Sequence, residues 1–192
     1  MITKISRDIA RTLINNSVIS FDEISVYQYG IELALVTFFE SMGLVIFALM
    51  TGRILETTAF VVAFTPLRLT AGGYHAKTVY RCFLYFLIMI IGSIAVTNGL
   101  SLHQYPVVSI IISFIAVTII FVFAPADVEN RRISITEESE FRNNARLLSL
   151  AYFSFVCIAL YNNVFAYYVT IFSIGMLMEA FTLIKVKTGR EN

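Results

Sequence analysis

The segment from Thr65 to Cys82 contains the side chains with the clearest capacity for chemistry. Its histidine, His75, precedes its cysteine, Cys82, by seven residues. Cysteine attacks as a thiolate, and a nearby histidine can accept the thiol proton and stabilise the anion. On one straight helix the two residues would lie about 10 Å apart along the axis. If they act as nucleophile and base, the chain between them has to bend.

The residues around this pair favour such a bend. Gly72 and Gly73 permit a break in the backbone or the close approach of another segment. A new helix capped by Thr78 would leave Cys82 in its first turns, where the helix dipole favours a thiolate. The same segment carries three cations that we consider for a supporting or substrate-binding role: Arg68, Lys77 and Arg81.

Each of these residues also has an interpretation without catalysis. A single cysteine at the edge of an apolar run usually packs against its neighbours, and a single loop histidine is usually solvated. One histidine and one cysteine supply two ligands where zinc takes three or four, so we expect no metal and no cofactor. The second cysteine, Cys157, lies in an apolar run without charged neighbours and is interpreted as a packing residue.

The composition of the whole chain defines the setting of this segment. Of its 192 residues, 58% are hydrophobic and 14% are charged, whereas soluble domains are about 25% charged. A soluble domain of this length has no interior large enough for so much apolar surface, so we predict a membrane protein. A net charge of +1 excludes a basic field for nucleic acid, and two cysteines exclude a disulfide framework. We expect no cleavable signal peptide, because the first apolar run begins only near Ile31.

Six apolar runs are candidates for membrane-spanning helices, each of which needs about 20 mostly apolar residues. We therefore predict an all-α polytopic membrane protein that forms a single transmembrane domain over residues 1–192. The second run is short and is expected to end at Pro66, so that a catalytic loop over residues 66–82 follows at the membrane edge. The predicted spans are residues 31–51, 54–67, 83–100, 107–124, 147–161 and 164–184.

The distribution of cations predicts the orientation in the cell membrane. With six spans and both termini inside, all of the 14 Lys and Arg residues except Arg53 fall on the inner segments. Cytoplasmic segments are enriched in Lys and Arg, so both termini and the 66–82 loop are predicted to be cytoplasmic. These inner segments are residues 1–30, 68–82, 125–146 and 185–192.

The N-terminal segment, residues 1–28, begins with an amphipathic pattern. We predict a helix on the inner leaflet, with its apolar side in the lipid and its basic side toward anionic head groups. The alternative is a helix packed on the rest of the protein. The apolar face consists of Ile2, Ile5, Ile9 and Leu13, and the basic face of Lys4, Arg7 and Arg11.

Two acids, Glu40 and Glu179, lie deep in apolar runs, where a carboxylate usually has a partner or a function. Either of them could pair with Arg68 or lie at a helix interface. Asp127 lies on the inner side and could equally cap a helix. The sequence therefore identifies no third catalytic residue.

With these residues in view, the chain resembles the accessory gene regulator protein B (AgrB) family. The stretch from Arg68 to Cys82, with Gly73 and His75 in order, carries the specific part of the resemblance. The runs 123–127 and 174–179, the six apolar runs and the chain length agree with it. Members of that family are integral-membrane cysteine endopeptidases of Gram-positive bacteria that process a small precursor, the AgrD peptide, for quorum sensing. The resemblance implies that His75 and Cys82 are the catalytic pair and that Arg68 and Gly73 match positions needed for activity.

The expected reaction follows from that resemblance. Cys82 attacks a peptide carbonyl near the C-terminal part of an AgrD-like precursor, and the acidic tail leaves. A thiol of the bound peptide then attacks the thioester and closes a thiolactone ring. Cations at the inner face suit an acidic tail, although the positive-inside bias alone would also put cations there. The alternatives are a peptide exporter or transporter and a non-catalytic membrane scaffold, and a homodimer is compatible with the short second span.

Overall fold

The protein is described here by a computed structural model that covers residues 2–15, 24–73, 79–126, 135–161 and 165–188. Every regular element in these ranges is a helix, and the β-type pairing among them is one isolated bridge between Gly72 and Ala126. Six of the described helices, α2 to α7, are long and apolar enough to cross a membrane. The predicted all-α polytopic fold is confirmed. In chain order the helices are α1 (Ile2–Asn15), α2 (Ile24–Thr51), α3 (Ile54–Ala71), α4 (Val79–Gly99), η2 (Leu102–Gln104), α5 (Pro106–Phe123), α6 (Ile135–Tyr161) and α7 (Ala166–Thr188).

The prediction that the second span ends at Pro66 is wrong. Pro66 lies inside α3, which continues to Ala71, so residues 66–71 belong to a helix and not to the predicted 66–82 loop. Proline has no N–H to donate to the carbonyl four residues earlier, which here belongs to Val62. The Tyr152 hydroxyl of α6 donates to that carbonyl oxygen at 2.7 Å. The helix continues through Pro66 because a neighbouring helix satisfies the backbone group that proline leaves unpaired.

The fifth span also differs from its prediction. The sequence predicts a span that begins at residue 147, whereas α6 begins at Ile135 and its candidate span begins at Glu138. The polar residues before 147 continue the helix, and Glu138 and Arg142 form an ion pair one turn apart on it. Pairs at this spacing stabilise a helix, so polarity alone does not end one.

The chain divides into two compact units, Met1–Gly52 and Arg53–Asn192. In the first unit, α1 packs against α2, with Ser6 and Ala10 completely buried. Ile5 and Ile9 remain exposed on α1. Of the two interpretations of this N-terminal helix, packing against another part of the protein is therefore observed within this unit. Its position on the inner leaflet of the membrane stays a prediction.

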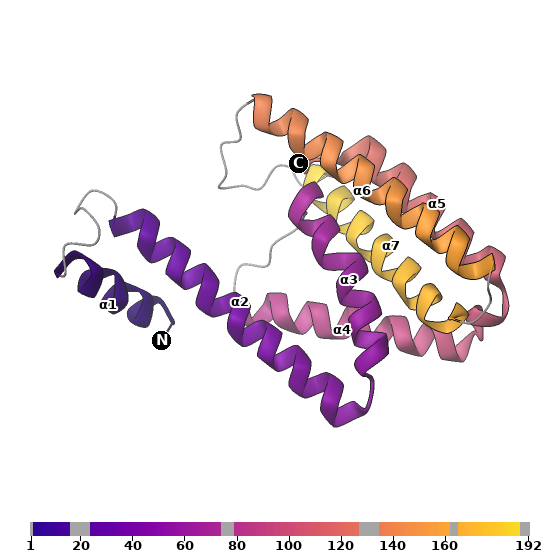
Figure 1. Cartoon of the computed structure of the whole chain (residues 1–192), viewed down its shortest axis with the longest axis horizontal. Helices are drawn as coiled ribbons and strands as arrows, with labels where there is room; N and C mark the ends of the chain where they lie inside the picture. The colour runs from indigo at the N-terminus through magenta and orange to yellow at the C-terminus, as the bar shows by residue number, and fades with distance from the viewer. Residues whose placement is uncertain (1, 16–23, 74–78, 127–134, 162–164, 189–192) are drawn as a thin grey trace. The chain divides into compact units, whose positions relative to one another are not determined.

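In the second unit, α7 is the central helix, because it packs against α3, α4, α5 and α6 (Figure 1). A Cβ on Gly175 would lie 3.1 Å from the Ala63 Cβ and 3.2 Å from the Phe60 carbonyl oxygen. Small residues therefore let α3 and α7 approach closely. Between α5 and α7, hydroxyl groups join Ser109 to Thr170 and Ser113 to Ser173, each at 2.9 Å.

Candidate functional site

The last turn of α3 carries a buried ion pair with α7. The Nη1 of Arg68 lies 3.3 Å from the Oε2 of Glu179 and 3.5 Å from the Oγ1 of Thr182. The Glu179 side chain is fully buried, and 16% of the Arg68 side chain is exposed. The guanidinium also lies 5.6 Å from the centre of the Phe64 ring. A cation suits the end of a helix, where the carbonyl groups carry partial negative charge.

Gly73, two residues after the last residue of α3, packs against this ion pair. Its φ of +133° is one that other residues rarely adopt. A Cβ there would collide with the Thr182 Oγ1 and would lie 3.0 Å from the Glu179 Oε1 and 3.1 Å from the Arg68 Nη1. Backbone conformation and space therefore both require glycine at this position.

Gly72 is held from another side by the residues after α5. The Ala126 N–H donates to the Ala71 carbonyl oxygen at 2.8 Å, next to the bridge between Gly72 and Ala126. Gly72 has a φ of +80°, and a Cβ there would collide with the Ala126 carbonyl oxygen. We call the residues Arg68, Gly72, Gly73, Ala126, Glu179 and Thr182 the α3 exit corner.

Arg146 of α6 supports the end of α5, directly before Ala126. Its Nη2 donates to the Phe121 carbonyl oxygen at 3.0 Å, and its guanidinium lies 5.2 Å from the centre of the Phe121 ring. The last carbonyl groups of a helix lack partners within the helix, so this contact satisfies one of them. The corner is thus built by the ends of α3 and α5, with α6 and α7 beside them.

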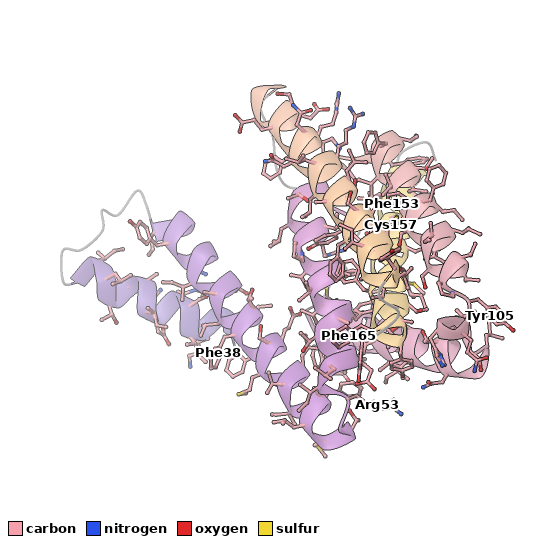
Figure 2. All side chains as sticks on the ribbon, turned by 45° about the vertical axis from the view of Figure 1, so that its right-hand side comes forward. Phe38, Arg53, Tyr105, Phe153, Cys157 and Phe165 are labelled. Atoms are coloured by element: carbon pink, nitrogen blue, oxygen red, sulfur yellow. The ribbon has the colours of Figure 1, made fainter. Side chains whose placement is uncertain are left out.

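Cys82 lies in the first turn of α4, which begins at Val79, as the sequence predicts. Its side chain is partly buried, and Arg81 beside it is exposed. Unpaired N–H groups at a helix start stabilise a nearby anion. His75 and Lys77, together with Thr78 and Asp127, lie outside the described residues. The second cysteine, Cys157, lies on α6 one turn after Phe153 (Figure 2).

Of the sequence-predicted site residues, the structure brings Arg68 and Gly73 together. Glu179 is the acid that pairs with Arg68, whereas Glu40 lies on α2 in the other unit. Thr182 and Ala126 were not anticipated from the sequence, because neither residue type is unusual in its segment. Only the glycine pair at 72–73 indicated a close approach, without naming the partner. Within the described ranges, no three His, Cys, Asp or Glu side chains are grouped so that they could hold a metal ion.

A second polar cluster lies where α3 and α7 begin. The Nη1 of Arg53 lies 2.9 Å from the Glu56 Oε1 and 3.4 Å from the Tyr167 hydroxyl. The hydrogen bond to Glu56 and its charge raise the pKa of Arg53 above its ordinary value. The His103 ring lies 5.5 Å from that of Tyr167. Arg53 and Arg68 are fifteen residues apart, about 22 Å along a helix, so this cluster is separate from the α3 exit corner.

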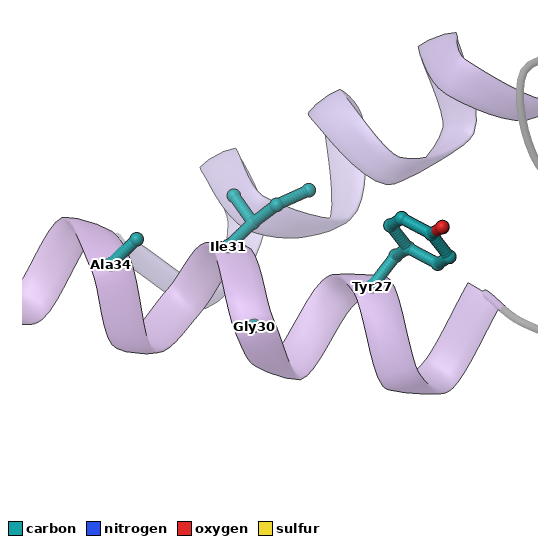
Figure 3. Close-up of a pocket in the computed structure, with 4 residues that line it drawn as sticks. All are labelled: Tyr27, Gly30, Ile31 and Ala34. Carbon is teal, nitrogen blue, oxygen red and sulfur yellow. The ribbon is translucent and has the colours of Figure 1, made fainter.

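A shallow pocket on α2 is lined by Tyr27, Gly30, Ile31 and Ala34 (Figure 3). The one polar side-chain group among these four residues is the Tyr27 hydroxyl. The candidate site residues Arg68, Gly73 and Cys82 belong to the other unit. A lining of this kind provides neither a nucleophile nor a base. The α3 exit corner and the start of α4 are therefore the candidate site.

Comparison with known protein families gives a match over most of the chain. The family model described as Accessory gene regulator B matches residues 6–183 of the chain. No curated protein and no solved structure matches it.

Proposed function

Since the chain belongs to that family and so has a role in the accessory gene regulator quorum-sensing system, we propose that it is a membrane cysteine endopeptidase that cleaves and cyclises an AgrD-like precursor. Cys82 is the nucleophile and His75 the base. The observation that carries the proposal is the position of Cys82 in the first turn of α4, nine residues after Gly73 of the α3 exit corner. A helix start stabilises the thiolate that the reaction needs.

The reaction proceeds in two acyl transfers. His75 takes the proton of the Cys82 thiol, and the sulfur attacks the scissile carbonyl carbon. The peptide C–N bond breaks, the departing amine takes the proton back from His75, and the rest of the precursor stays on Cys82 as a thioester. His75 then takes the proton of a cysteine thiol of the bound peptide, and that sulfur attacks the thioester and closes the thiolactone. The C–S bond to Cys82 breaks, and the released Cys82 sulfur takes the proton back from His75. Neither step consumes water or ATP, so the site has to exclude water until the ring closes.

The cations near the site support an acidic tail as the leaving fragment. Arg81 is exposed beside Cys82, and Lys77 lies five residues before it in the sequence. Arg68 is mostly buried and pairs with Glu179, whereas the Arg81 side chain is exposed. We therefore assign attraction of the tail to Arg81 and Lys77. The positive-inside distribution favours a position of this site and both chain termini on the cytoplasmic side of the cell membrane.

Substitution of the two cysteines tests the proposal. The Cys82→Ala and Cys157→Ala variants are purified, reconstituted in lipid vesicles and incubated with a precursor peptide, and the products are weighed by mass spectrometry. We expect Cys157→Ala to release the tail without added water, as the unchanged protein does, and Cys82→Ala to leave the precursor intact. Cleavage by Cys82→Ala would refute the nucleophile assignment.

The product masses also separate the alternatives. Loss of the tail with one added water indicates a simple protease, and no covalent change by the unchanged protein indicates an exporter or a scaffold. A thiol-selective alkylating agent gives a second test. Cys82 is expected to react faster than Cys157, because only Cys82 of the two lies at a helix start. Equal rates would contradict an activated thiolate.

A further inference from the structure

The ion pair between Arg68 and Glu179 is an unusual feature for a membrane-spanning segment. Both residues lie within candidate spans, and the Glu179 side chain is completely buried. A buried ion pair gains little stability over apolar side chains of similar size, because both charges lose their hydration. Charged groups inside a membrane protein are therefore a reason to look for a function.

The two carboxylate oxygens of Glu179 make different contacts. Oε2 accepts a hydrogen bond from Arg68, whereas Oε1 has no hydrogen-bond partner among the described residues and faces Gly73. Thr182 donates from its hydroxyl to the Glu179 backbone carbonyl at 2.9 Å and also lies beside Gly73. Three side chains from two helices thus surround one glycine Cα.

We propose that Glu179 is a positioning residue for the peptidase reaction. It holds Arg68 at the end of α3 and packs against Gly73, so the backbone at the end of α3 is held in one conformation. The residues that the proposed function uses, His75 and Cys82, follow that point by two and nine residues. This inference rests on the proposed function and adds a residue from the far end of the chain, 111 positions after Arg68.

The competing explanation is that the pair only stabilises the fold. The chain offers a matched control, because α3 carries a second acid in an ion pair. Glu56 is 8% exposed and pairs with Arg53, but at the start of α3, away from the loop. Loss of Glu56 removes an ion pair from the same helix, although one with a more exposed cation, and leaves the α3 exit corner intact.

The test compares Glu179→Gln with Glu56→Gln in lipid vesicles. We expect Glu179→Gln to lower kcat for precursor cleavage about tenfold or more with KM almost unchanged, because small displacements of reacting groups have effects of this size. Glu56→Gln is expected to keep kcat within about twofold of the unchanged protein. An unchanged kcat for Glu179→Gln, or an equal loss for Glu56→Gln, would overturn the proposal.

A double-mutant cycle tests whether Glu179 acts through Arg68. If it does, Glu179→Gln causes little further loss of kcat once Arg68→Gln is present. Full additivity would show that Glu179 acts independently and would overturn the mechanism. Arg68→Gln leaves the buried Glu179 carboxylate without a compensating charge, which destabilises the protein. The variant with Met at both positions 68 and 179 has no charge there and therefore serves as the folded reference. Wild-type activity in that variant would also contradict a positioning role.

Amide hydrogen exchange gives a readout that does not depend on peptidase activity. The Gly72 N–H donates to the Arg68 carbonyl oxygen, and the Ala126 N–H donates to that of Ala71. Both amides are expected to exchange faster in Glu179→Gln and at the normal rate in Glu56→Gln. Unchanged exchange in Glu179→Gln would overturn the inference and leave the proposed function standing, whereas cleavage by Cys82→Ala would overturn the proposed function on which the inference rests.

Discussion

Replacement of Gly73 by alanine is the most direct test of the α3 exit corner. The new methyl group would meet the Thr182 hydroxyl, the Glu179 Oε1 and the Arg68 Nη1, the last two at 3.0 and 3.1 Å. The chain would also have to keep a φ of +133° with a side chain attached. We expect the substitution to destabilise the protein, because either the backbone or the ion pair has to move.

Two contributions determine how much Gly73→Ala lowers the free energy of unfolding. A non-glycine residue in a sparsely populated backbone conformation costs about 1–3 kcal/mol. An extra methyl group in a packed interior costs about 1–3 kcal/mol. The expected loss for Gly73→Ala is therefore about 2–6 kcal/mol, with the lower end reached if the Arg68 and Glu179 side chains can shift.

Other glycines of the chain separate the two contributions. Gly52 has a φ of +67°, but no described atom lies within 4 Å of the position that a Cβ would take, so Gly52→Ala reports backbone strain alone. Gly92 lies inside α4 with similar open space and no positive φ, so Gly92→Ala is expected to be neutral or to stabilise by about 0.5–1 kcal/mol. Gly72→Ala combines strain with a collision against a backbone oxygen, which cannot move as a side chain can. We therefore expect the largest loss at Gly72.

Free energies of unfolding of the purified variants, from denaturation in mixed micelles followed by circular dichroism, provide the measurement. From the most to the least stable variant, the expected order is Gly92→Ala, Gly52→Ala, Gly73→Ala and Gly72→Ala. If Gly73→Ala were as stable as Gly52→Ala, the packing of Gly73 against α7 would be refuted. If Gly73→Ala matched Gly92→Ala, the positive φ would be refuted as well.

Two further predictions concern the helices that hold the corner. Tyr152→Phe is expected to cost about 1 kcal/mol of unfolding free energy, because it removes the donor to the Val62 carbonyl. In a Pro66→Ala background that cost is expected to fall, since an alanine N–H satisfies the same carbonyl, and an equal cost in both backgrounds would contradict the account of Pro66. Ser113→Ala is expected to cost about 0.6–1.7 kcal/mol through loss of the bond to Ser173. A cycle with Ser173→Ala measures that interaction, and full additivity would show that the two hydroxyls do not interact.

The number of spanning helices could be predicted from the sequence because the bilayer sets the length and polarity of each one. The ends of the helices could not, because they depend on contacts between helices. α3 passes through Pro66 with the help of Tyr152, which lies 90 residues from the carbonyl that it satisfies. α6 begins in a polar segment, where hydrophobicity gives no boundary.

The construction of the site could be predicted only in part, and the catalytic roles of its residues stay predictions. The types of His75 and Cys82 indicated a nucleophile and a base, and the start of α4 at Val79 agrees with the prediction for Cys82. The apolar surroundings of Glu179 predicted that it has a partner or a function. The sequence did not decide whether Glu179 or Glu40 pairs with Arg68. The choice required the packing of α3 on α7, which no local pattern encodes.

The two glycines at the end of α3 have a different meaning in the structure from the one that their sequence first suggested. A glycine pair between helices indicates a break that gives the backbone freedom. Here Gly72 is in contact with Ala126, and Gly73 is enclosed by Glu179 and Thr182, so both are glycine because there is no room for a side chain. The backbone at Gly72 and Gly73, shortly before the proposed catalytic pair in the sequence, is therefore held by residues that come more than 50 positions later. Under the proposed function, we expect substitutions in α7 to alter the reaction without touching the proposed nucleophile.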